Sequence, residues 1–236
     1  MVKHIVIAID GPSSSGKSTL ARELAQALGL RYIDSGAYYR ALTWFLMERR
    51  INLSDETGIE ALLPQLNLEF RYNAATGQCA MFLNGRNVED SIRQPAVSVR
   101  ASEVSALPIV RKFITEVLRK AAENTDVVMD GRDIGTVVLP EATVKIFLTA
   151  DEQVRLQRRL EQLQRQGMQI QEQEIAADLN RRDHQDSRRA LAPLRQAPDA
   201  IVIDNSHLTR DQQRELVLNL IKEKLNLTNP IYEGNH

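Results

Sequence analysis

Short, continuous apolar runs alternate with stretches of helical periodicity along most of the chain. Five of these runs are typical of buried parallel strands, which are apolar throughout rather than at alternate positions. They cover residues 5–9, 30–33, 127–129, 144–148 and 201–203. Between them, the apolar spacing predicts helices at about 17–28, 37–50, 109–123, 151–166 and 209–225. The alternation predicts an α/β fold with a doubly wound parallel sheet of five strands.

One region between the second and third strands breaks this alternation. Residues 68–72 and 79–83 flank a turn that contains Gly77, and an Asn-Gly pair at 84–85 is a second turn signal. The region therefore predicts a small antiparallel sheet, carried by an insertion at about 64–105.

Composition and charge narrow the class of protein. The 236 residues include 30 basic and 31 acidic side chains, and a formal net charge of −1 gives no overall field for a nucleic-acid polymer or a membrane surface. The single cysteine, Cys79, excludes an internal disulfide and a cysteine-rich zinc site. No apolar run approaches the ~20 residues of a membrane helix. We expect a soluble cytoplasmic protein, and a monomer because no apolar stripe marks an obligate interface.

A glycine-rich motif follows the first predicted strand. Residues 11–18 match G-x-x-x-x-G-K-[ST] at every fixed position, with a strand before the motif and a helix after it. Its glycines let backbone N–H groups face phosphates, Lys17 can reach the β- and γ-phosphates, and the Ser18 hydroxyl can ligate Mg²⁺. The positive end of the following helix adds to the same site. We therefore predict a P-loop, against the alternative of a glycine-rich turn without a ligand.

A P-loop alone does not separate kinases from other nucleotide-dependent proteins. GTPases usually carry a guanine-reading Asn-Lys-x-Asp stretch, and the sequence has none. Large ATPase machines need a longer chain. These exclusions favour a small kinase.

A polar loop follows the second predicted strand. It runs from Asp34 through Ser35 to Arg40. Ligands of doubly wound sheets bind beyond the carboxyl ends of the strands, where this loop is expected. The alternative is that Asp34 or Ser35 only caps the next helix, which leaves Arg40 unexplained.

A second polar group, from Asp130 to Asp133, follows the third predicted strand, at 127–129. Asp130 at the strand end can hold the hydration shell of Mg²⁺, and Arg132 can bind a phosphate bidentately. We predict a metal site formed by Ser18 and Asp130, the latter through water. The alternative is a structural ion network of the two acids and the arginine.

A basic segment at about 168–195 has helical stretches but carries charge on too many faces for a core element. Its arginines are Arg181, Arg182, Arg188, Arg189 and Arg195. Phosphoryl transfer spreads negative charge over the transferred group, and arginines that fold over it stabilise that charge. We interpret the segment as a short, mobile helical lid, with a solvated charged face as the alternative.

Together, these motifs resemble those of the bacterial-type cytidylate kinases, the CMP and dCMP kinases among the nucleoside monophosphate kinases. The resemblance spans about residues 4–225 and depends on IDGPSSSGKSTLA, YIDSGAYYRA, VVMDGRDIGTVV, VKIFLTA and RRDHQDSRRALAPL, in the family's order. It implies transfer of the γ-phosphate of ATP, with Mg²⁺, to CMP or dCMP. It also implies three parts, namely a P-loop core domain (1–63, 106–167 and 196–236), a monophosphate-binding insertion (64–105) and a lid (168–195).

The same resemblance implies roles for individual residues. ATP would be held by Gly11, Pro12, Ser13, Ser14, Ser15, Gly16, Lys17, Ser18 and Thr19. Ser35 and Arg40 would contact the acceptor nucleotide, with Arg40 at its phosphate, and Arg132 and Arg189 would also bind phosphate. Ser102, Arg111 and Asp133 would contact the cytosine. Arg182 and Asp186 would hold the sugar. The catalytic cations would be those of Lys17, Arg132, Arg182 and Arg189.

Two alternatives stay open at this stage. The first is a kinase for another small acceptor, such as UMP, AMP or shikimate. The second is a non-catalytic regulator that binds ATP as a switch. The tail at 226–236 matches nothing in the family pattern.

Overall fold

A computed structural model describes residues 4–225 except 74, 77, 166, 169 and 170. Its main sheet has five parallel strands in the order β2-β6-β1-β7-β8. The strands are β1 (Val6–Asp10), β2 (Arg31–Asp34), β6 (Val127–Gly131), β7 (Val144–Thr149) and β8 (Ile201–Asp204). All five predicted strands are therefore confirmed. The central strands are mostly apolar because both faces of the sheet are covered.

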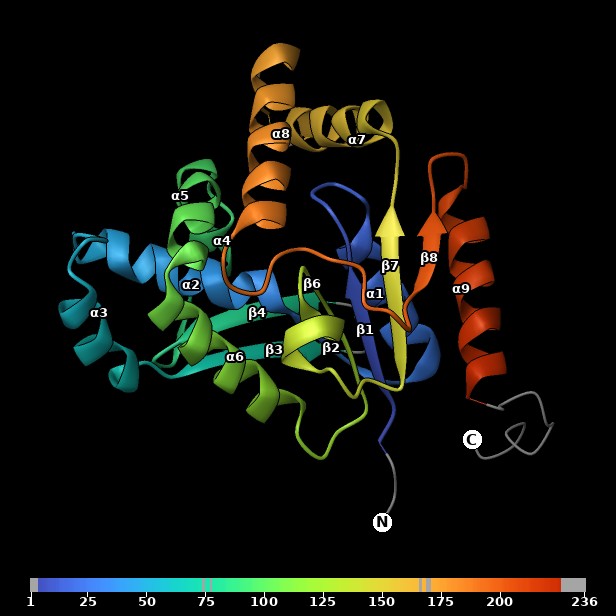
Figure 1. The fold of residues 1–236 in the computed structure, drawn as a ribbon, viewed down its shortest axis with the longest axis horizontal. Helices are drawn as coiled ribbons and strands as arrows, with labels where there is room; N and C mark the ends of the chain where they lie inside the picture. Colours follow the sequence, from blue (N-terminus) through green and yellow to red (C-terminus); the bar gives the residue numbers. More distant parts are fainter. Residues whose placement is uncertain (1–3, 74, 77, 166, 169–170, 226–236) are drawn as a thin grey trace.

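Helices cover this sheet and continue beyond its ends (Figure 1). The predicted helices are confirmed as α1 (Lys17–Leu28), α2 (Ser35–Glu48), α6 (Pro108–Ala122), α7 (Glu152–Arg165) and α9 (Arg210–Lys224). Helix α9 lies beside β8 at one edge of the sheet, and α2 and α6 lie toward the other (Figure 1). A capping box starts α9, in which the Thr209 hydroxyl accepts the Gln212 N–H and the Gln212 side chain accepts the Thr209 N–H.

The insertion contains the predicted antiparallel sheet and more. Strands β3 (Leu68–Asn73), β4 (Gln78–Leu83) and β5 (Arg86–Asn87) form it in that order. Gly77 of the predicted turn lies outside the described residues, as does the tail at 226–236. Two helices follow this sheet, α4 (Glu89–Ile92) and α5 (Pro95–Ala106), and the sequence did not predict them. Helix α3 (Glu56–Leu62) and the 3₁₀ turn η1 (Leu63–Gln65) precede the sheet.

The basic segment forms one regular helix, α8 (Glu172–Arg188), rather than separate helical stretches. Its buried Ile175 and Leu179 pack against Leu156 and Leu163 of α7 in a small cluster separate from the main core. Figure 1 shows α8 crossing α7 beyond the ends of the strands. Within the described residues, no helix is both long enough and apolar enough to cross a membrane.

Candidate active site

A cavity of about 1470 Å³ lies at the carboxyl ends of β2 and β6, between the P-loop, the insertion and α8. Ligand sites of doubly wound sheets occur at this end of the strands. The cavity exceeds the usual volume of roughly 300–1,000 Å³ for one small molecule, so it has room for two. All the predicted site residues line it except Gly11, Pro12 and Ser15, which belong to the P-loop behind its wall.

The P-loop has the backbone that phosphate binding requires. A Cβ at Gly11, whose φ is 154°, would lie 2.0 Å from the carbonyl oxygen of Leu148, so only glycine fits this approach to β7. Gly16, with φ of 94°, turns the chain into α1. Lys17 is only 5% exposed, and its Nζ donates to the Pro12 carbonyl at 2.7 Å. Burial and then the nearby Arg132 cation lower the pKa of Lys17 to about 7.

The two predicted metal ligands lie side by side. The Ser18 Oγ donates to Asp130 Oδ2 at 2.7 Å, and the Tyr32 hydroxyl donates to Asp130 Oδ1 at 2.8 Å. Burial, followed by the Asp34 charge, raises the pKa of Asp130. A hydroxyl next to one carboxylate suits Mg²⁺, which is usually bound by one or two carboxylates together with substrate phosphates and water. In the described part of the chain, no group of three or more His, Cys, Asp or Glu side chains could hold a metal by itself.

Asp34 both caps a helix and pairs with two cations. Its Oδ1 accepts the Ala37 N–H at 3.0 Å, which confirms the predicted cap of α2. Its Oδ2 accepts from Arg40 at 2.7 Å and from Arg93 of the segment after α4 at 3.1 Å. Burial acts to raise the pKa of Asp34, but Arg40 and Arg93 outweigh it and hold the pKa at about 2. Capping was therefore only part of the role of this loop.

We expect Asp34→Asn to lower the free energy of unfolding by about 3 kcal/mol at pH 7, because it leaves two partly buried guanidinium groups without their anion. Asparagine keeps the helix cap, so the change isolates the charge. The folded pKa of about 2 lies below the ordinary 3.8, so this stabilisation is present above pH 4 and is lost as the pH falls toward 2. Urea unfolding at several pH values measures it.

The matched control for this change is Glu69→Gln. Glu69 also pairs with an arginine, Arg71 at 2.8 Å, but on the exposed face of β3. We expect no measurable change in stability from it. An Asp34→Asn loss no larger than that of the control, or one that does not shrink toward pH 2, would contradict the role of the Asp34 charge.

Asp133 pairs with two arginines that are far apart in sequence. Its Oδ2 accepts from Arg111 at 2.6 Å and its Oδ1 from Arg189 at 3.2 Å. Asp133 and Arg111 are each 4% exposed, and the Arg111 guanidinium lies 5.4 Å from the centre of the Tyr39 ring. Burial, then the Arg111 charge, lowers the pKa of Arg189. The alternative of an ion network among Asp130, Arg132 and Asp133 is wrong, because Asp133 pairs with Arg111 and Arg189 while Arg132 pairs with Asp186. The network that Asp133 does form lies in the cavity wall.

The remaining predicted arginines point from β6 and α8 toward the same space. Arg132 donates to Asp186 at 2.7 Å and to the Ser13 hydroxyl at 3.0 Å. Arg182 pairs with Asp178 at 2.8 Å on the same helix. The Nε groups of Arg40 and Arg182 are buried without a hydrogen-bond partner among the described residues. Unsatisfied buried donors at a cavity wall are consistent with an anionic ligand.

The sequence did not single out several residues that shape the site. Asp10 accepts the N–H groups of Ile134 at 2.8 Å and Gly135 at 2.7 Å, and so holds the π-helix η2 (Ile134–Val138) beside the P-loop. Burial raises the pKa of Asp10 to about 6. Asn205 donates to the Ser15 carbonyl at 2.9 Å from the end of β8. The position of Asp10 at the end of the strand before the P-loop was the one available signal.

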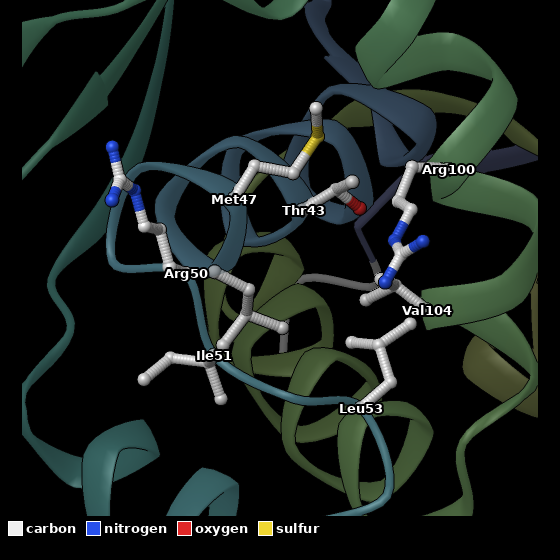
Figure 2. A pocket seen from close by; sticks show the side chains of 8 residues that line it. Thr43, Met47, Arg50, Ile51, Leu53, Arg100 and Val104 are labelled. Carbon is white, nitrogen blue, oxygen red and sulfur yellow. The ribbon is translucent and has the colours of Figure 1, made fainter.

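A second cavity, of about 360 Å³, lies between α2, the segment after it and α5 (Figure 2). Its wall is mostly apolar, with Ile51, Leu53 and Val104 around it and the Arg100 side chain at its rim (Figure 2). The Thr43 hydroxyl in its wall donates to the Tyr39 carbonyl at 2.7 Å. None of the predicted site residues lines this cavity.

Comparison with known proteins identifies the family. The model of the family described as cytidylate kinase matches residues 7–223. The chain belongs to the cytidylate kinase family. It is 45% identical over 223 residues to a cytidylate kinase of Flavobacterium psychrophilum, covering 93% of this chain and 99% of the relative. It is 43% identical over 220 residues to a cytidylate kinase of Parabacteroides distasonis, covering 92% and 96%.

The resemblance to cytidylate kinases drawn from the motifs is thereby confirmed. Among solved structures, that of an uncharacterized protein from Eubacterium ventriosum matches with a TM-score of 0.51 at 13% identity, covering 93% of this chain and 99% of that one. This likeness supports the fold alone. The cytidylate kinase match includes the P-loop, the insertion and α8, so every wall of the large cavity belongs to the family region.

Proposed function

We propose that this protein transfers the γ-phosphate of ATP to CMP or dCMP, giving CDP or dCDP. The observation that carries the proposal is the common cavity, in which a buried P-loop lysine, Lys17, faces the same space as the Arg111–Asp133–Arg189 network. Family membership names the acceptor, and the cavity volume accommodates two nucleotides.

In this proposal, the P-loop and its flanking residues hold ATP. Residues 14–19 turn backbone N–H groups toward the phosphates at the positive end of α1, and Gly11, Pro12 and Ser13 shape the start of the loop. Ser18, and Asp130 through water, would hold Mg²⁺, which would supply positive charge to the phosphate oxygens. The side-by-side position of the two oxygen groups supports this pair.

The acceptor nucleotide contacts the other walls. Arg40 binds its phosphate beside Ser35, and Arg182 with Asp186 holds its sugar. Ser102 of α5, Arg111 of α6 and Asp133 read the cytosine. A carboxylate has about four acceptor positions, so Asp133 can accept from the exocyclic amine of cytosine while it stays paired with both arginines.

Catalysis then depends on positioning and positive charge. The acceptor phosphate oxygen is already an anion near neutral pH, so the reaction requires no general base. Lys17, Arg132, Arg182 and Arg189 stabilise the charge that spreads over the transferred group. Closure of α8 and the insertion over the two nucleotides keeps water from the γ-phosphate. We further propose that the core, insertion and lid divide at the predicted boundaries, and that the protein acts as a cytoplasmic monomer.

Release of ADP with CMP, dCMP, UMP, AMP, GMP and shikimate offered separately tests the acceptor. We expect turnover with CMP and dCMP to exceed that with each other acceptor by about a hundredfold, because a site that hydrogen-bonds one base edge leaves its polar groups unpaired with another. Preference for a different acceptor would overturn the cytosine-reading residues but keep the kinase. Slow ATP hydrolysis that no acceptor accelerates would favour the regulator instead.

A further inference from the structure

One residue of the P-loop, Ser13, is held through both its backbone N–H and its backbone carbonyl by residues outside the loop. Asp183 of α8 accepts the Ser13 N–H through Oδ1 at 3.0 Å. Arg155 of α7 donates from Nη1 to the Ser13 carbonyl at 3.2 Å. The same Nη1 also donates to Asp183 Oδ2, so Ser13, Asp183 and Arg155 form a closed ring of hydrogen bonds. The P-loop, α7 and α8 thus meet at one residue, Ser13.

The Arg155 end of this ring is a fixed anchor. Arg155 is 8% exposed, and its Nε donates to the Ala150 carbonyl at 3.1 Å at the end of β7. Its guanidinium is therefore bound to the end of the sheet independently of α8. Asp183 supplies the compensating anion, because a buried cation that loses its partner is strongly unfavourable. Neither Asp183 nor Arg155 lines the large cavity.

A second contact between α8 and the P-loop is made by residues that do line the large cavity. Asp186, three residues after Asp183 and so on the same face of α8, pairs with Arg132, which also donates to the Ser13 hydroxyl. Arg132 and Asp186 both line the cavity and both have ligand roles in the proposed function. Asp183 and Arg155 have no such role, and the Ser13 N–H that Asp183 accepts is not one of those assigned to the phosphates.

We propose that Asp183 and Arg155 form a latch that fixes α8 on the P-loop at Ser13, and that Asp183 is a positioning residue for phosphoryl transfer. The inference rests on the proposed function, since the residues that the latch places are Arg182, Asp186 and Arg189. All three lie within six residues of Asp183, with Arg182 and Asp186 in α8 and Arg189 directly after the helix. When the latch is weakened, α8 holds these groups less closely to the P-loop and water gains access to the γ-phosphate.

The first test is the partition of ATP turnover between CMP and water in Asp183→Asn. Asparagine keeps an oxygen for the Ser13 N–H but removes the charge that compensates Arg155. We expect kcat/KM for CMP to fall by about tenfold to a hundredfold, and the fraction of ADP formed by hydrolysis to rise by about threefold or more. A purely structural role would lower both routes in proportion. Glu174→Gln is the matched control, because Glu174 is an exposed acid in the first turn of the same helix.

Hydrogen exchange of the backbone amides supplies a readout that does not depend on activity. In folded Asp183→Asn, we expect exchange at Ser13 and along α8 to be about tenfold faster than in the wild type, with no change in β1 or in the control. The latch is overturned if the folded variant keeps the partition ratio and the exchange rates of the wild type. If the wild-type protein does not phosphorylate CMP, the proposed function fails, while the exchange result still decides whether the latch exists.

Discussion

Replacement of Lys17 by alanine is expected to lower kcat/KM for CMP phosphorylation by about 10³, or roughly 4 kcal/mol of transition-state stabilisation. Lys17 is the P-loop cation that reaches the β- and γ-phosphates in the proposed complex, and water that enters its place in the cavity carries no compensating charge. Steady-state assays with saturating CMP and varied Mg-ATP measure the loss. Wild-type kcat/KM in the variant would contradict the P-loop assignment.

The same substitution is not expected to weaken the fold. The folded pKa of Lys17, about 7, is below the ordinary 10.5, so burial disfavours the charged side chain in the folded protein. Between pH 7 and pH 10.5, the unfolded chain binds more protons at Lys17 than the folded protein does. The contribution of Lys17 to the free energy of unfolding therefore rises with pH over this range. Removal of the ammonium at pH 7 therefore leaves the free energy of unfolding unchanged or higher. Lys222→Ala, at an exposed site near the end of α9, is the control for nonspecific effects on activity.

The parts of the fold that local patterns determine could be predicted from the sequence. The five strands are mostly apolar, and the P-loop is marked by fixed glycine, lysine and serine positions within eight consecutive residues. The capping box at Thr209 is likewise a contact between residues three apart. Each signal lies within a few residues of the structure it specifies.

Helix α5 shows why other parts could not be predicted. Only Val97 and Val104 of its twelve residues are buried, so its apolar spacing is too sparse to show helical periodicity. Ser98, Ser102 and Ser105 of this helix instead line the cavity. A helix that presents a polar face to a ligand site carries little of the amphipathic signal that sequence methods use.

The prediction of the site was limited by contacts between residues that are far apart in the sequence. The motifs identified most of the residues that gather at the cavity, because these follow a strand or lie in the basic segment. Ser102 and Arg111 came only from the resemblance to the cytidylate kinases. They did not give the partners, since Asp133 pairs with residues 22 and 56 positions away. The π-helix after β6 depends on Asp10, more than 120 positions earlier. Arg93 and Asp183 acquire their roles only through tertiary contacts of this kind.

The pairing of Asp133 also decides how its role should be tested. Asp133→Ala would leave the nearly buried Arg111 and Arg189 facing each other without an anion, and the resulting loss of stability would mask any change in base selectivity. Asparagine also removes the anion, but it leaves no cavity and keeps one acceptor oxygen for the arginines, so the loss of stability is smaller than with alanine. It also adds an amide that can donate. Uracil presents a carbonyl where cytosine presents its amine, so an amide at this position can bind either base.

We therefore expect Asp133→Asn to reduce the preference for CMP over UMP by about tenfold to a hundredfold, or roughly 1.4–2.7 kcal/mol, while KM for ATP changes by less than about threefold. The ratio of kcat/KM for the two acceptors measures the effect, and Asp211→Asn, at an exposed acid that pairs with Arg214 on α9, is the control. An equal loss for every acceptor base would rule out cytosine reading by Asp133. It would leave Asp133 as the anion that holds Arg111 and Arg189 in place, because removing a structural anion displaces both arginines whichever base is bound.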